Sequence, residues 1–317
     1  MSNNLPLVSV CIPAYNHEKY VTDCLKSVIG QTYENIELII IDDGSKDETK
    51  QKILDLMPDM EKRFVRVFFE SQSNMGTCRT INKLYENTNG KYVYHIASDD
   101  MAKPDAISTL VDFLEANNEY ALAVGDNEII DGDGVRAFWD ENRNNVYDVK
   151  DAKYLTFGDF LKKTNQRLDF SSEQFGTYST LFGNNYVPNG YLVRYEILKK
   201  TGPLTPNAPL EDWWFMLQIS KYAKMKYIDK VLFSYRWHGA NTINNVERIL
   251  SMFDKTAKYE WNLLKKLKFS GMLPDVRKTY RRECRRRFVH SFIYHRTQID
   301  DKIVLRLFGF IHISYKK

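Results

Sequence analysis

Two adjacent carboxylates, Asp99 and Asp100, follow a segment with the composition of a buried strand. Tyr92–Ala97 is rich in aromatic and β-branched residues, which predicts a strand that ends just before the two acids. Carboxylates at one strand end are costly unless a divalent cation, a basic partner or solvent balances their charge. Oxygen ligands favour Mg²⁺ or Mn²⁺, which one or two carboxylates often hold together with substrate phosphates. The pair indicates either a metal site or an acidic turn that caps the next helix.

A second acidic pair, Glu211 and Asp212, is followed directly by Trp213 and Trp214. A carboxylate beside large aromatic rings is in a setting that can raise its pKa, and a general base that works near neutral pH benefits from such a shift. The two indole rings can also offer a face on which a sugar stacks. Asp212 equally suits the N-cap of a helix predicted to run to about Ala223, and capping and catalysis are compatible.

The elements that must position these acids alternate between strands and helices over residues 7–116. This alternation predicts an α/β fold with a doubly wound, mostly parallel sheet. The predicted strands are Leu7–Ile12, Ile36–Ile41, Arg66–Glu70 and Tyr92–Ala97. The predicted helices are Glu18–Ile29, Ser45 to about Met57 after a capping box, Cys78–Glu86 and Ala106–Ala116.

In a doubly wound sheet, ligands bind in the crevice beyond the carboxyl ends of the strands. Four polar sites follow predicted strands and are expected to converge there: Tyr15, Asp43, the Asn74–Arg79 turn and the Asp99–Asp100 pair. The sequence contains neither the GxGxxG pattern nor a Walker A lysine loop. Their absence disfavours the common dinucleotide and P-loop binding sites.

The second half of the chain is less regular but contains further predicted elements. A hairpin turn is expected at Asp131–Gly134. From Arg248 the spacing of apolar residues predicts a helix, and a second, strongly basic helix is predicted over Arg277–Arg296. Strands are expected over Tyr120–Gly125, Asn127–Ile130, Tyr191–Tyr195 and Lys226–Tyr235.

Charge is distributed unevenly along the chain, although the net charge is only +4. Residues 1–247 contain 27 Lys and Arg against 35 Asp and Glu, whereas residues 248–317 contain 18 against 6. A basic tail on an acidic body suggests an anionic surface or ligand for the tail. Apolar residues recur every four positions in the basic segment, which predicts an amphipathic helix with this stripe: Val276, Tyr280, Cys284, Phe288 and Phe292.

Composition favours a folded cytoplasmic protein. The hydrophobic content of 43% is ample for a core, and the four cysteines lack CxxC spacing, as expected of buried thiols in a reducing compartment. We expect no signal peptide, because the first residues lack a basic segment and a long apolar core. No run approaches eighteen apolar residues, so no spanning helix is expected. No RNP, zinc or OB signature indicates a nucleic-acid partner.

Several segments together resemble family 2 glycosyltransferases of the GT-A fold. The matching pieces are, in chain order, VSVCIPAYN, IELIIIDDGSKDET, NMGTCRTIN, YHIASDD, EDWW and YRWH. Their order and spacing match over roughly residues 6–240, and the Ile36–Thr49 block is highly specific. We expect a GT-A catalytic domain over residues 1–240, with a nucleotide-sugar half at 1–116 and an acceptor half at 117–240. A basic helical region is expected over residues 241–317.

The resemblance implies nucleotide-sugar-binding roles for five residues: Pro13, Tyr15, Asp43, Arg79 and Asp99. Tyr15 would stack on the nucleotide base, and Asp43 would accept a hydrogen bond from a ring N–H of that base. Arg79 would contact the base or its phosphates, and Asp99 would hold the ribose or the sugar. Plainer interpretations of these residues are a packed aromatic ring, a turn residue and a surface residue on a helix.

The resemblance also implies the groups that do the chemistry. Asp100 would ligate the Mn²⁺ or Mg²⁺ that bridges the diphosphate, and His238 would lie near the diphosphate or the metal. Asp212 would be the general base. Glu211, Trp213 and Trp214 would contact the acceptor. A single histidine is more often a packing residue than a ligand, and His17 is expected to be solvated.

The implied function is metal-dependent, inverting transfer of a sugar from a nucleotide-diphosphate donor, expected to be a UDP-sugar. The acceptor would be a hydroxyl of a saccharide, such as a polyprenyl-diphosphate-linked one, in polysaccharide or O-antigen-like glycan assembly. One alternative is a sugar-nucleotide pyrophosphorylase, which needs a Gly/Arg/Lys-rich loop where this chain has PAYNHEKY. Another is a non-catalytic sugar- or nucleotide-binding module, which would not need the acid at position 212.

The basic tail allows two interpretations. It is either a helical layer packed on the catalytic domain with a solvated basic face, or a peripheral contact with the cytoplasmic leaflet. In the second case anionic lipids would contribute about 1 kcal/mol per nearby Lys or Arg. The apolar patch Ile303–Ile313 is too short to span a bilayer and is interrupted by Arg306.

Overall fold

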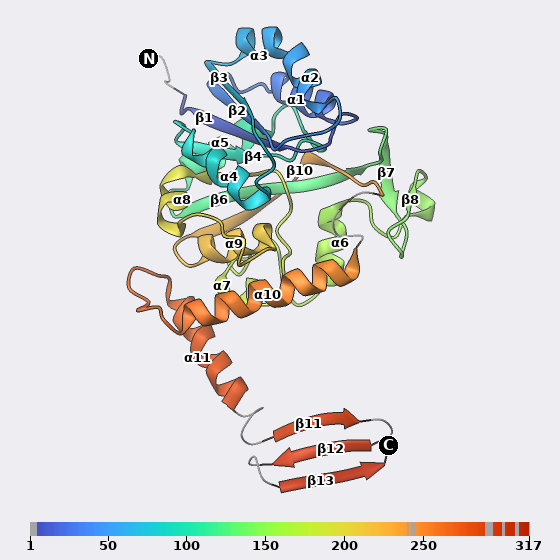
Figure 1. Cartoon of the computed structure of the whole chain (residues 1–317), viewed down its shortest axis with the longest axis vertical. Coiled ribbons are helices and arrows are strands. Elements are labelled where there is room, and N and C mark those ends of the chain that lie inside the picture. The colour runs from blue at the N-terminus through green and yellow to red at the C-terminus, as the bar shows by residue number, and fades with distance from the viewer. Residues whose placement is uncertain are drawn as a thin grey trace.

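The computed structural model describes residues 5–239, 241, 245–288, 294–299, 302–307 and 311–316. A ten-stranded mixed sheet forms its centre, with eight strands in the order β3-β2-β1-β4-β9-β6-β10-β5 and with β7 and β8 extending from β6 (Figure 1). The strands of this sheet are β1 (Val8–Ala14), β2 (Ile36–Asp42), β3 (Arg66–Ser71), β4 (Tyr92–His95), β5 (Met101–Ala102), β6 (Tyr120–Ile130), β7 (Arg136–Trp139), β8 (Asn145–Val146), β9 (Tyr191–Arg194) and β10 (Lys224–Arg236).

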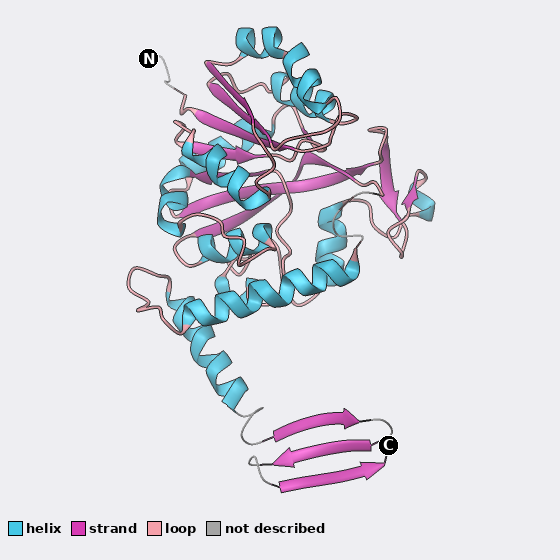
Figure 2. Cartoon of the chain, in the orientation of Figure 1, coloured by secondary structure: helices cyan, strands magenta, loops and turns pink. Residues whose placement is uncertain are grey.

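Helices cover both sides of the sheet (Figure 2). They are α1 (Val21–Ile29), α2 (Thr49–Asp55), α3 (Met57–Arg63), α4 (Thr77–Glu86), α5 (Ala106–Ala116), the 3₁₀ turn η1 (Val149–Asp151), α6 (Phe157–Thr164), α7 (Tyr178–Leu181), α8 (Tyr195–Thr201), α9 (Glu211–Ser220), α10 (Val246–Leu264) and α11 (Pro274–Phe288). No helix among the described residues is long and apolar enough to cross a membrane.

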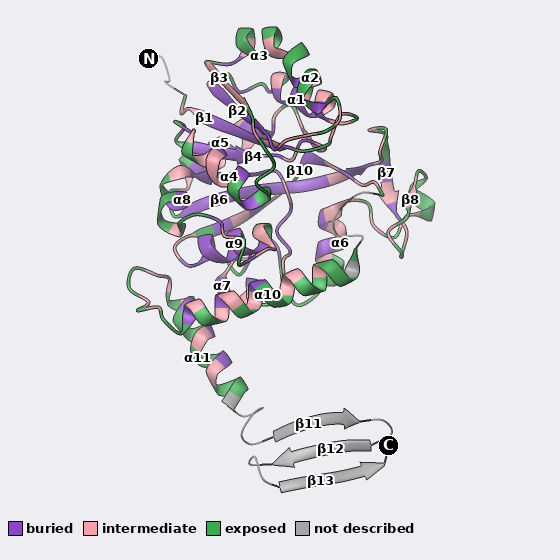
Figure 3. Ribbon diagram, in the orientation of Figure 1, coloured by how far each residue is buried: buried purple, intermediate pink, exposed green. Residues whose placement is uncertain are grey.

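Alternation along each strand divides the core into two layers. In β2, Leu38 and Ile40 pack into the cluster that contains α1 and α5, whereas Ile39 and Ile41 pack into the cluster that contains α4 and α9. Successive side chains of a strand point to opposite faces, so a strand covered on both sides must be apolar throughout. Every residue of β2 is buried, and Figure 3 shows the buried strands between partly exposed helices.

The expected doubly wound, mostly parallel sheet is confirmed. β1 pairs in parallel with β2 and β4, β2 pairs in parallel with β3, and β6 pairs in parallel with β10. β9 is inserted antiparallel between β4 and β6 and joins the two parallel parts. Because β1, β2 and β4 run in one direction, the segments that follow them meet at a single edge of the sheet.

Two boundaries differ from the sequence prediction. The helix expected from Ser45 begins at Thr49, because the Ser45 hydroxyl accepts a hydrogen bond from the N–H of Asn16 instead of capping a helix. The two strands expected over residues 120–130 are one strand, β6, which is buried on both faces through Asp126 and Asn127. The expected hairpin at residues 131–134 is present, since β7 pairs antiparallel with β6.

The C-terminal region is not purely helical, which corrects that part of the predicted architecture. The basic helix expected over Arg277–Arg296 ends at Phe288, and a separate antiparallel sheet follows (Figure 1). Its strands are β11 (Tyr294–Ile299), β12 (Lys302–Leu307) and β13 (Ile311–Lys316). Phe292, the last member of the predicted apolar stripe, lies outside the described residues.

A buried ion pair holds α10 against the end of α9. Lys221 Nζ lies 2.8 Å from Glu260 Oε1, and both side chains are 1% exposed. Tyr178 donates a hydrogen bond to the same carboxylate, and Gln218 bonds to both members of the pair. Removing one member would leave a buried charge unpaired, at a cost of about 3–5 kcal/mol. The expected domain boundary near residue 240 stays a prediction. Apolar residues of α10 nevertheless pack into the core cluster that also contains α4 and α9.

The loop between β3 and α4 is fixed by Asp43, the residue directly after β2. The Asp43 carboxylate accepts hydrogen bonds from the N–H groups of Met75 (2.8 Å) and Gly76 (2.9 Å) and from the Gln72 side chain (2.9 Å). Gly44 allows the close approach: its φ is 76°, and a Cβ there would lie 2.8 Å from the backbone nitrogen of Asn74. Asp43 is thus a structural anchor as well as a candidate ligand-binding residue.

We predict that Asp43→Asn loosens this loop. The amide nitrogen of asparagine would face a backbone N–H donor in place of an acceptor, and an unsatisfied buried donor costs about 1–3 kcal/mol. Amide hydrogen exchange at Met75 and Gly76 should accelerate about tenfold or more. Asp59→Asn, an exposed substitution on α3, is the matched control. Unchanged exchange at both amides in Asp43→Asn would contradict the anchoring role.

Candidate active site

The loops after β1 and β2 are tied together by reciprocal hydrogen bonds. The Asn16 side chain accepts from the N–H of Lys46, and the Asn16 N–H donates to Ser45, both at 2.9 Å. Asn16 has a φ of 53°, a left-handed conformation that asparagine tolerates better than most residues. This geometry leaves the Tyr15 side chain exposed at 43% beside the buried Asp43, so the ring has a face available for a planar ligand.

Arg236, the last residue of β10, is buried and forms hydrogen bonds with several other segments of the chain. Its backbone N–H donates to Asp100 Oδ1 at 2.8 Å, and its Nε donates to the carbonyl of Asp99 at 2.7 Å. The same guanidinium pairs with Asp23 of α1 at 3.0 Å and lies 5.0 Å from the Tyr20 ring centre. It also donates to the carbonyl of Gly132 in the turn after β6. One residue therefore positions the acidic pair against two other segments, the start of α1 and the turn after β6.

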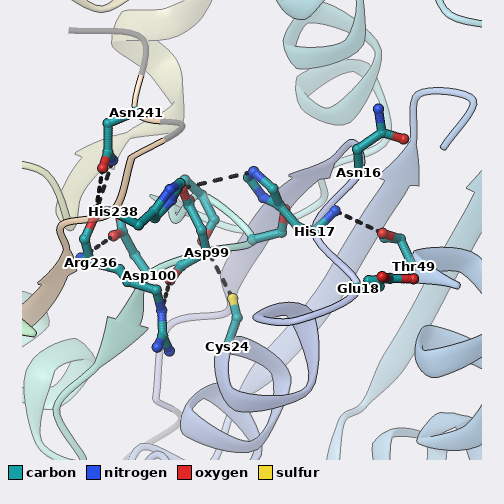
Figure 4. A network of polar contacts seen from close by, with 12 residues as sticks. Asn16, His17, Glu18, Cys24, Thr49, Asp99, Asp100, Arg236, His238 and Asn241 are labelled. Carbon is teal, nitrogen blue, oxygen red and sulfur yellow. Dashed lines mark hydrogen bonds and ion pairs between the residues drawn. The ribbon is translucent and has the colours of Figure 1, made fainter. Parts of the chain in front are cut away.

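Asp99 lies between two histidines (Figure 4). Its Oδ2 is 3.2 Å from His238 Nε2 and 3.8 Å from His17 Nε2, while His17 Nδ1 is 2.8 Å from the Ser98 hydroxyl. Burial raises the pKa of Asp99, but the hydrogen bond from His238 and the nearby His17 outweigh this effect and hold the pKa below its ordinary value. His17 therefore belongs to the site, and the prediction that it is solvated is wrong.

Asp100 is 2% exposed, and its pKa shifts in the opposite direction from that of Asp99. Burial and the negative charge of Asp99 raise its pKa well above the ordinary value, although the N–H and charge of Arg236 act in the opposite direction. A buried carboxyl group of this kind gains from a nearby cation, which stabilises its charged form.

The donor set at this edge suits a hard divalent ion that substrate oxygens also bind. Asp99, Asp100 and His238 supply carboxylate and imidazole groups, which Mn²⁺ and Mg²⁺ accept. Within the described part of the chain, no group of three or more His, Cys, Asp or Glu side chains is arranged to hold a metal alone. A metal bound here would need ligands from a substrate, as is usual for Mg²⁺ beside phosphates.

Asp212 stands in the first turn of α9 with its carboxylate open to solvent. Oδ2 accepts a hydrogen bond from the Asn185 amide at 2.9 Å, and Oδ1 lies 2.6 Å from the N–H of Trp213. The surrounding protein displaces enough water to raise the pKa of Asp212, while these hydrogen bonds limit the rise. The carboxylate is accessible, oriented and more basic than an ordinary aspartate, as a general base must be.

Trp213 and Trp214 do not form a sugar platform. Their side chains are 2% and 5% exposed, and Trp213 donates to the carbonyl of Leu181 while stacking on Phe253 of α10 at 4.4 Å. Both indoles therefore lack the exposed face that stacking on an acceptor requires, and this prediction is wrong. The tryptophans instead pack α9 against α10, which sets the position of Asp212.

The remaining predicted site residues lie at the same edge. Pro13 is half-buried near the end of β1, and Arg79 is exposed in the first turn of α4, directly after the loop that Asp43 fixes. Glu211 is half-buried, and desolvation together with the charge of Asp212 raises its pKa to about 7. The structure thus places Pro13, Asp43 and Arg79 in or after the carboxyl ends of β1, β2 and β3, while Arg236 contacts the acidic pair that follows β4.

Two residues of the site, Arg236 and His17, were not assigned from sequence. The acidic pair signalled the need for a basic partner, and Arg236 lies in the YRWH segment that was singled out. His17 carried no comparable signal. Its role depends on the meeting of three segments that are far apart in the chain.

The comparisons with known proteins agree with this geometry. The model of glycosyl transferase family 2 matches residues 9–183, more than half of the chain. An uncharacterized glycosyltransferase from Haemophilus influenzae is 30% identical over 241 residues, which cover 75% of this chain and 68% of that protein.

Two solved structures resemble the chain in fold at 14% sequence identity. One is S. aureus TarS 1-349 in complex with UDP-GlcNAc, with a TM-score of 0.56 and coverage of 98% of this chain and 99% of that chain. The other is a mannosyltransferase from Pyrobaculum calidifontis in complex with GDP-Man and Mn²⁺, with a TM-score of 0.58 and coverage of 91% and 71%. The chain accordingly belongs to glycosyl transferase family 2 and adopts the GT-A fold.

Proposed function

We propose that the chain transfers a sugar, with inversion, from a UDP-sugar to a hydroxyl of a saccharide acceptor in polysaccharide or glycan assembly. The observation that carries the proposal is the acidic pair Asp99–Asp100, which Arg236 holds beside His238 at the carboxyl edge of the sheet. Asp212 supplies a second, accessible carboxylate of raised pKa on α9. A nucleotide-sugar donor fits the family and the bound ligands named for both solved structures.

The nucleotide would lie over the ends of β1 and β2. Tyr15 offers an exposed ring for stacking on the base, and Pro13 lines the same edge. Asp43 can accept a hydrogen bond from a ring N–H of the base if its carboxylate keeps an acceptor position beside its three existing bonds. Arg79 starts α4 next to this position and would contact the base or its phosphates. Asp99 would hold the ribose or sugar.

Asp100 and His238 would hold a divalent metal, Mn²⁺ or Mg²⁺, at the diphosphate. When bound, such an ion offsets the negative charge that develops on the leaving diphosphate. Mn²⁺ in the mannosyltransferase structure is consistent with this assignment. Arg236 would position the site without contacting the substrate, because it is fully buried. It holds Asp100 through its backbone N–H and Asp99 through its side chain.

The transfer itself needs one base. Asp212 would take the proton of the acceptor hydroxyl while its oxygen forms a bond to the anomeric carbon. The bond from that carbon to the diphosphate breaks at the same time, and its electron pair leaves with the nucleoside diphosphate. A single displacement of this kind inverts the configuration at the anomeric carbon. Asn185 orients Asp212 through its amide.

Donor hydrolysis and transfer should require a divalent metal. We predict that EDTA abolishes turnover of a UDP-sugar by the wild-type protein, and that added Mn²⁺ or Mg²⁺ restores it. Asp100→Asn preserves an acceptor for the Arg236 N–H but removes the anionic ligand, so it should reduce turnover by about 10²-fold or more.

Asp112→Asn, on the exposed face of α5, is the control for the charge change. A panel of UDP- and GDP-sugars, combined with titration calorimetry of UDP and GDP, identifies the donor. Full activity in EDTA would refute the metal assignment, and much tighter binding of GDP would refute the UDP assignment.

Asp212→Asn should lower kcat by about 10²–10⁴-fold, the usual contribution of a positioned base. Nucleotide binding should change little, because the substitution keeps the shape of the side chain. In the wild type, kcat should rise with pH through a pKa above about 4, the ordinary value for aspartate, because only the deprotonated base is active. Near-normal turnover in Asp212→Asn would move the base elsewhere, and Glu211→Gln would test the first alternative.

The exposed face of α11 supports peripheral contact with an anionic membrane. It presents six exposed cations: Arg277, Lys278, Arg281, Arg282, Arg285 and Arg286. Arg287 lies instead over the Trp261 ring of α10, at 4.3 Å from its centre. Arg282 and Arg286 also lie within 4 Å of Glu283, which partly balances the charge. α11 leads away from the central sheet, so this face is not covered by it (Figure 1). Such a contact would bring the active site to a lipid-linked acceptor.

We predict that the protein co-sediments with liposomes containing anionic lipid and that physiological salt weakens this binding. Replacing Arg277, Arg281 and Arg285 with alanine should reduce the bound fraction several-fold. A control variant removes three exposed lysines elsewhere, Lys50, Lys62 and Lys200. Absence of binding at low salt, or an equal loss in the control, would leave α11 as a packed layer with a solvated face.

A further inference from the structure

A pocket of ≈ 430 Å³ lies beside Glu211, next to the proposed base Asp212. The loop at the start of α4 forms part of its wall, but none of the residues assigned to donor binding lines it. Its walls come from that loop, from the proline-containing loop before α9, from Glu211 and from one face of α10. This volume is within the usual range for small-ligand sites. The lining residues on the loops are Met75, Gly76, Thr77, Cys78, Pro206 and Pro209.

The α10 wall is a regular helical stripe. Arg248, Ser251, Met252 and Lys255 all line the pocket, at the spacing that places residues on one face of a helix. Arg248 and Lys255 are seven residues apart, so their backbones are separated by about 10 Å along the helix axis. Both side chains are exposed, and no ion pair of either within 4 Å is found in the part of the chain that the structure describes, although the charge of Arg248 acts on Glu211 and opposes the rise of its pKa.

The pocket is therefore positively charged near neutral pH. Its single carboxyl group belongs to Glu211, whose pKa desolvation and the charge of Asp212 raise to about 7, so that it is only partly ionised. α4 begins at this pocket without a side-chain cap, which adds the positive end of a helix dipole. Met75, Met252 and the prolines supply apolar surface between the charged groups.

We propose that this pocket binds an anionic group of the acceptor, a phosphate or a carboxylate, through Arg248 and Lys255. The inference rests on the proposed function, because it takes the neighbouring Asp212 as the base that activates the acceptor. A guanidinium pairs with phosphate or carboxylate through two parallel hydrogen bonds, and the lysine adds a second charge. The acceptor would then be an acidic saccharide or a saccharide on a lipid diphosphate.

The donor diphosphate does not account for this pocket. Its phosphates are assigned to Asp100 and His238, after the ends of β4 and β10, and Arg79 of α4 would contact the base or the phosphates; none of the three lines the pocket. Tyr15 and Asp43, which would hold the base, are also absent from its walls. The two cations instead lie on α10, across from the start of α4.

The test uses the full chain saturated with Mn²⁺ and with UDP or GDP, whichever binds, so that the donor site is filled. Titration calorimetry then compares glucose 1-phosphate, glucuronate and geranyl diphosphate with neutral glucose. We expect at least one anionic probe to bind ten or more times tighter than glucose. Tightest binding of geranyl diphosphate indicates a lipid-diphosphate acceptor, and tightest binding of either charged sugar indicates an acidic saccharide.

Arg248→Ala combined with Lys255→Ala should weaken binding of the favoured probe at least tenfold, with nucleotide affinity unchanged. Lys258→Ala combined with Lys265→Ala removes the same charge outside the pocket and should change affinity less than twofold. Absence of anion binding, equal binding of glucose, an equal loss in the control, or a parallel loss of nucleotide affinity would each overturn the proposal. Donor hydrolysis is measured separately, so its absence would refute the proposed function and not the anion site.

Discussion

The contact between Arg236 and the acidic pair is the interaction on which the candidate site depends. Two carboxylates at one buried strand end repel each other, and Asp100 in particular is held where water cannot solvate it. Arg236 offsets this cost with its charge and fixes the geometry with its backbone N–H and its Nε. Because the same guanidinium reaches Asp23 and the turn at Gly132, the position of the pair is set by two other segments as well, α1 and the turn after β6.

Hydrogen bonds also fix the loops after β1, β2 and β3, where the nucleotide is proposed to bind. Asn16 in its left-handed conformation locks the loop after β1 to the loop after β2, and Asp43 locks the latter to the start of α4. Three loops are thereby held by polar groups that the sheet edge would otherwise leave unpaired. Loops fixed in this way are ready for a ligand before it arrives, so less conformational entropy is lost when it binds.

The sequence was sufficient for most of the central sheet, and the roles assigned to the candidate site residues stay predictions. Continuous apolar runs such as β2 can only lie between two covered faces, and α5 was predicted with its observed bounds. The start of α2 could not be predicted, because Ser45 is used by Asn16, a residue from another loop. The burial of Trp213 depends on Phe253 of α10, and the place of His17 depends on Asp99 and on Ser98. Such pairings arise only in three dimensions.

The attachment of α10 has a consequence for how relatives of this protein can diverge. The matched family model ends at residue 183, before the two walls of the positively charged pocket that come from the start of α9 and from α10. α10 is held through Glu260, which pairs with Lys221 at the end of α9 and does not line the pocket, whereas Arg248 and Lys255 of the same helix do. Residues on the pocket face can therefore change without disturbing the buried pair or the donor loops. Under the proposed function, α10 would be a wall whose pocket residues could change with the acceptor while the residues proposed to bind the donor stay the same.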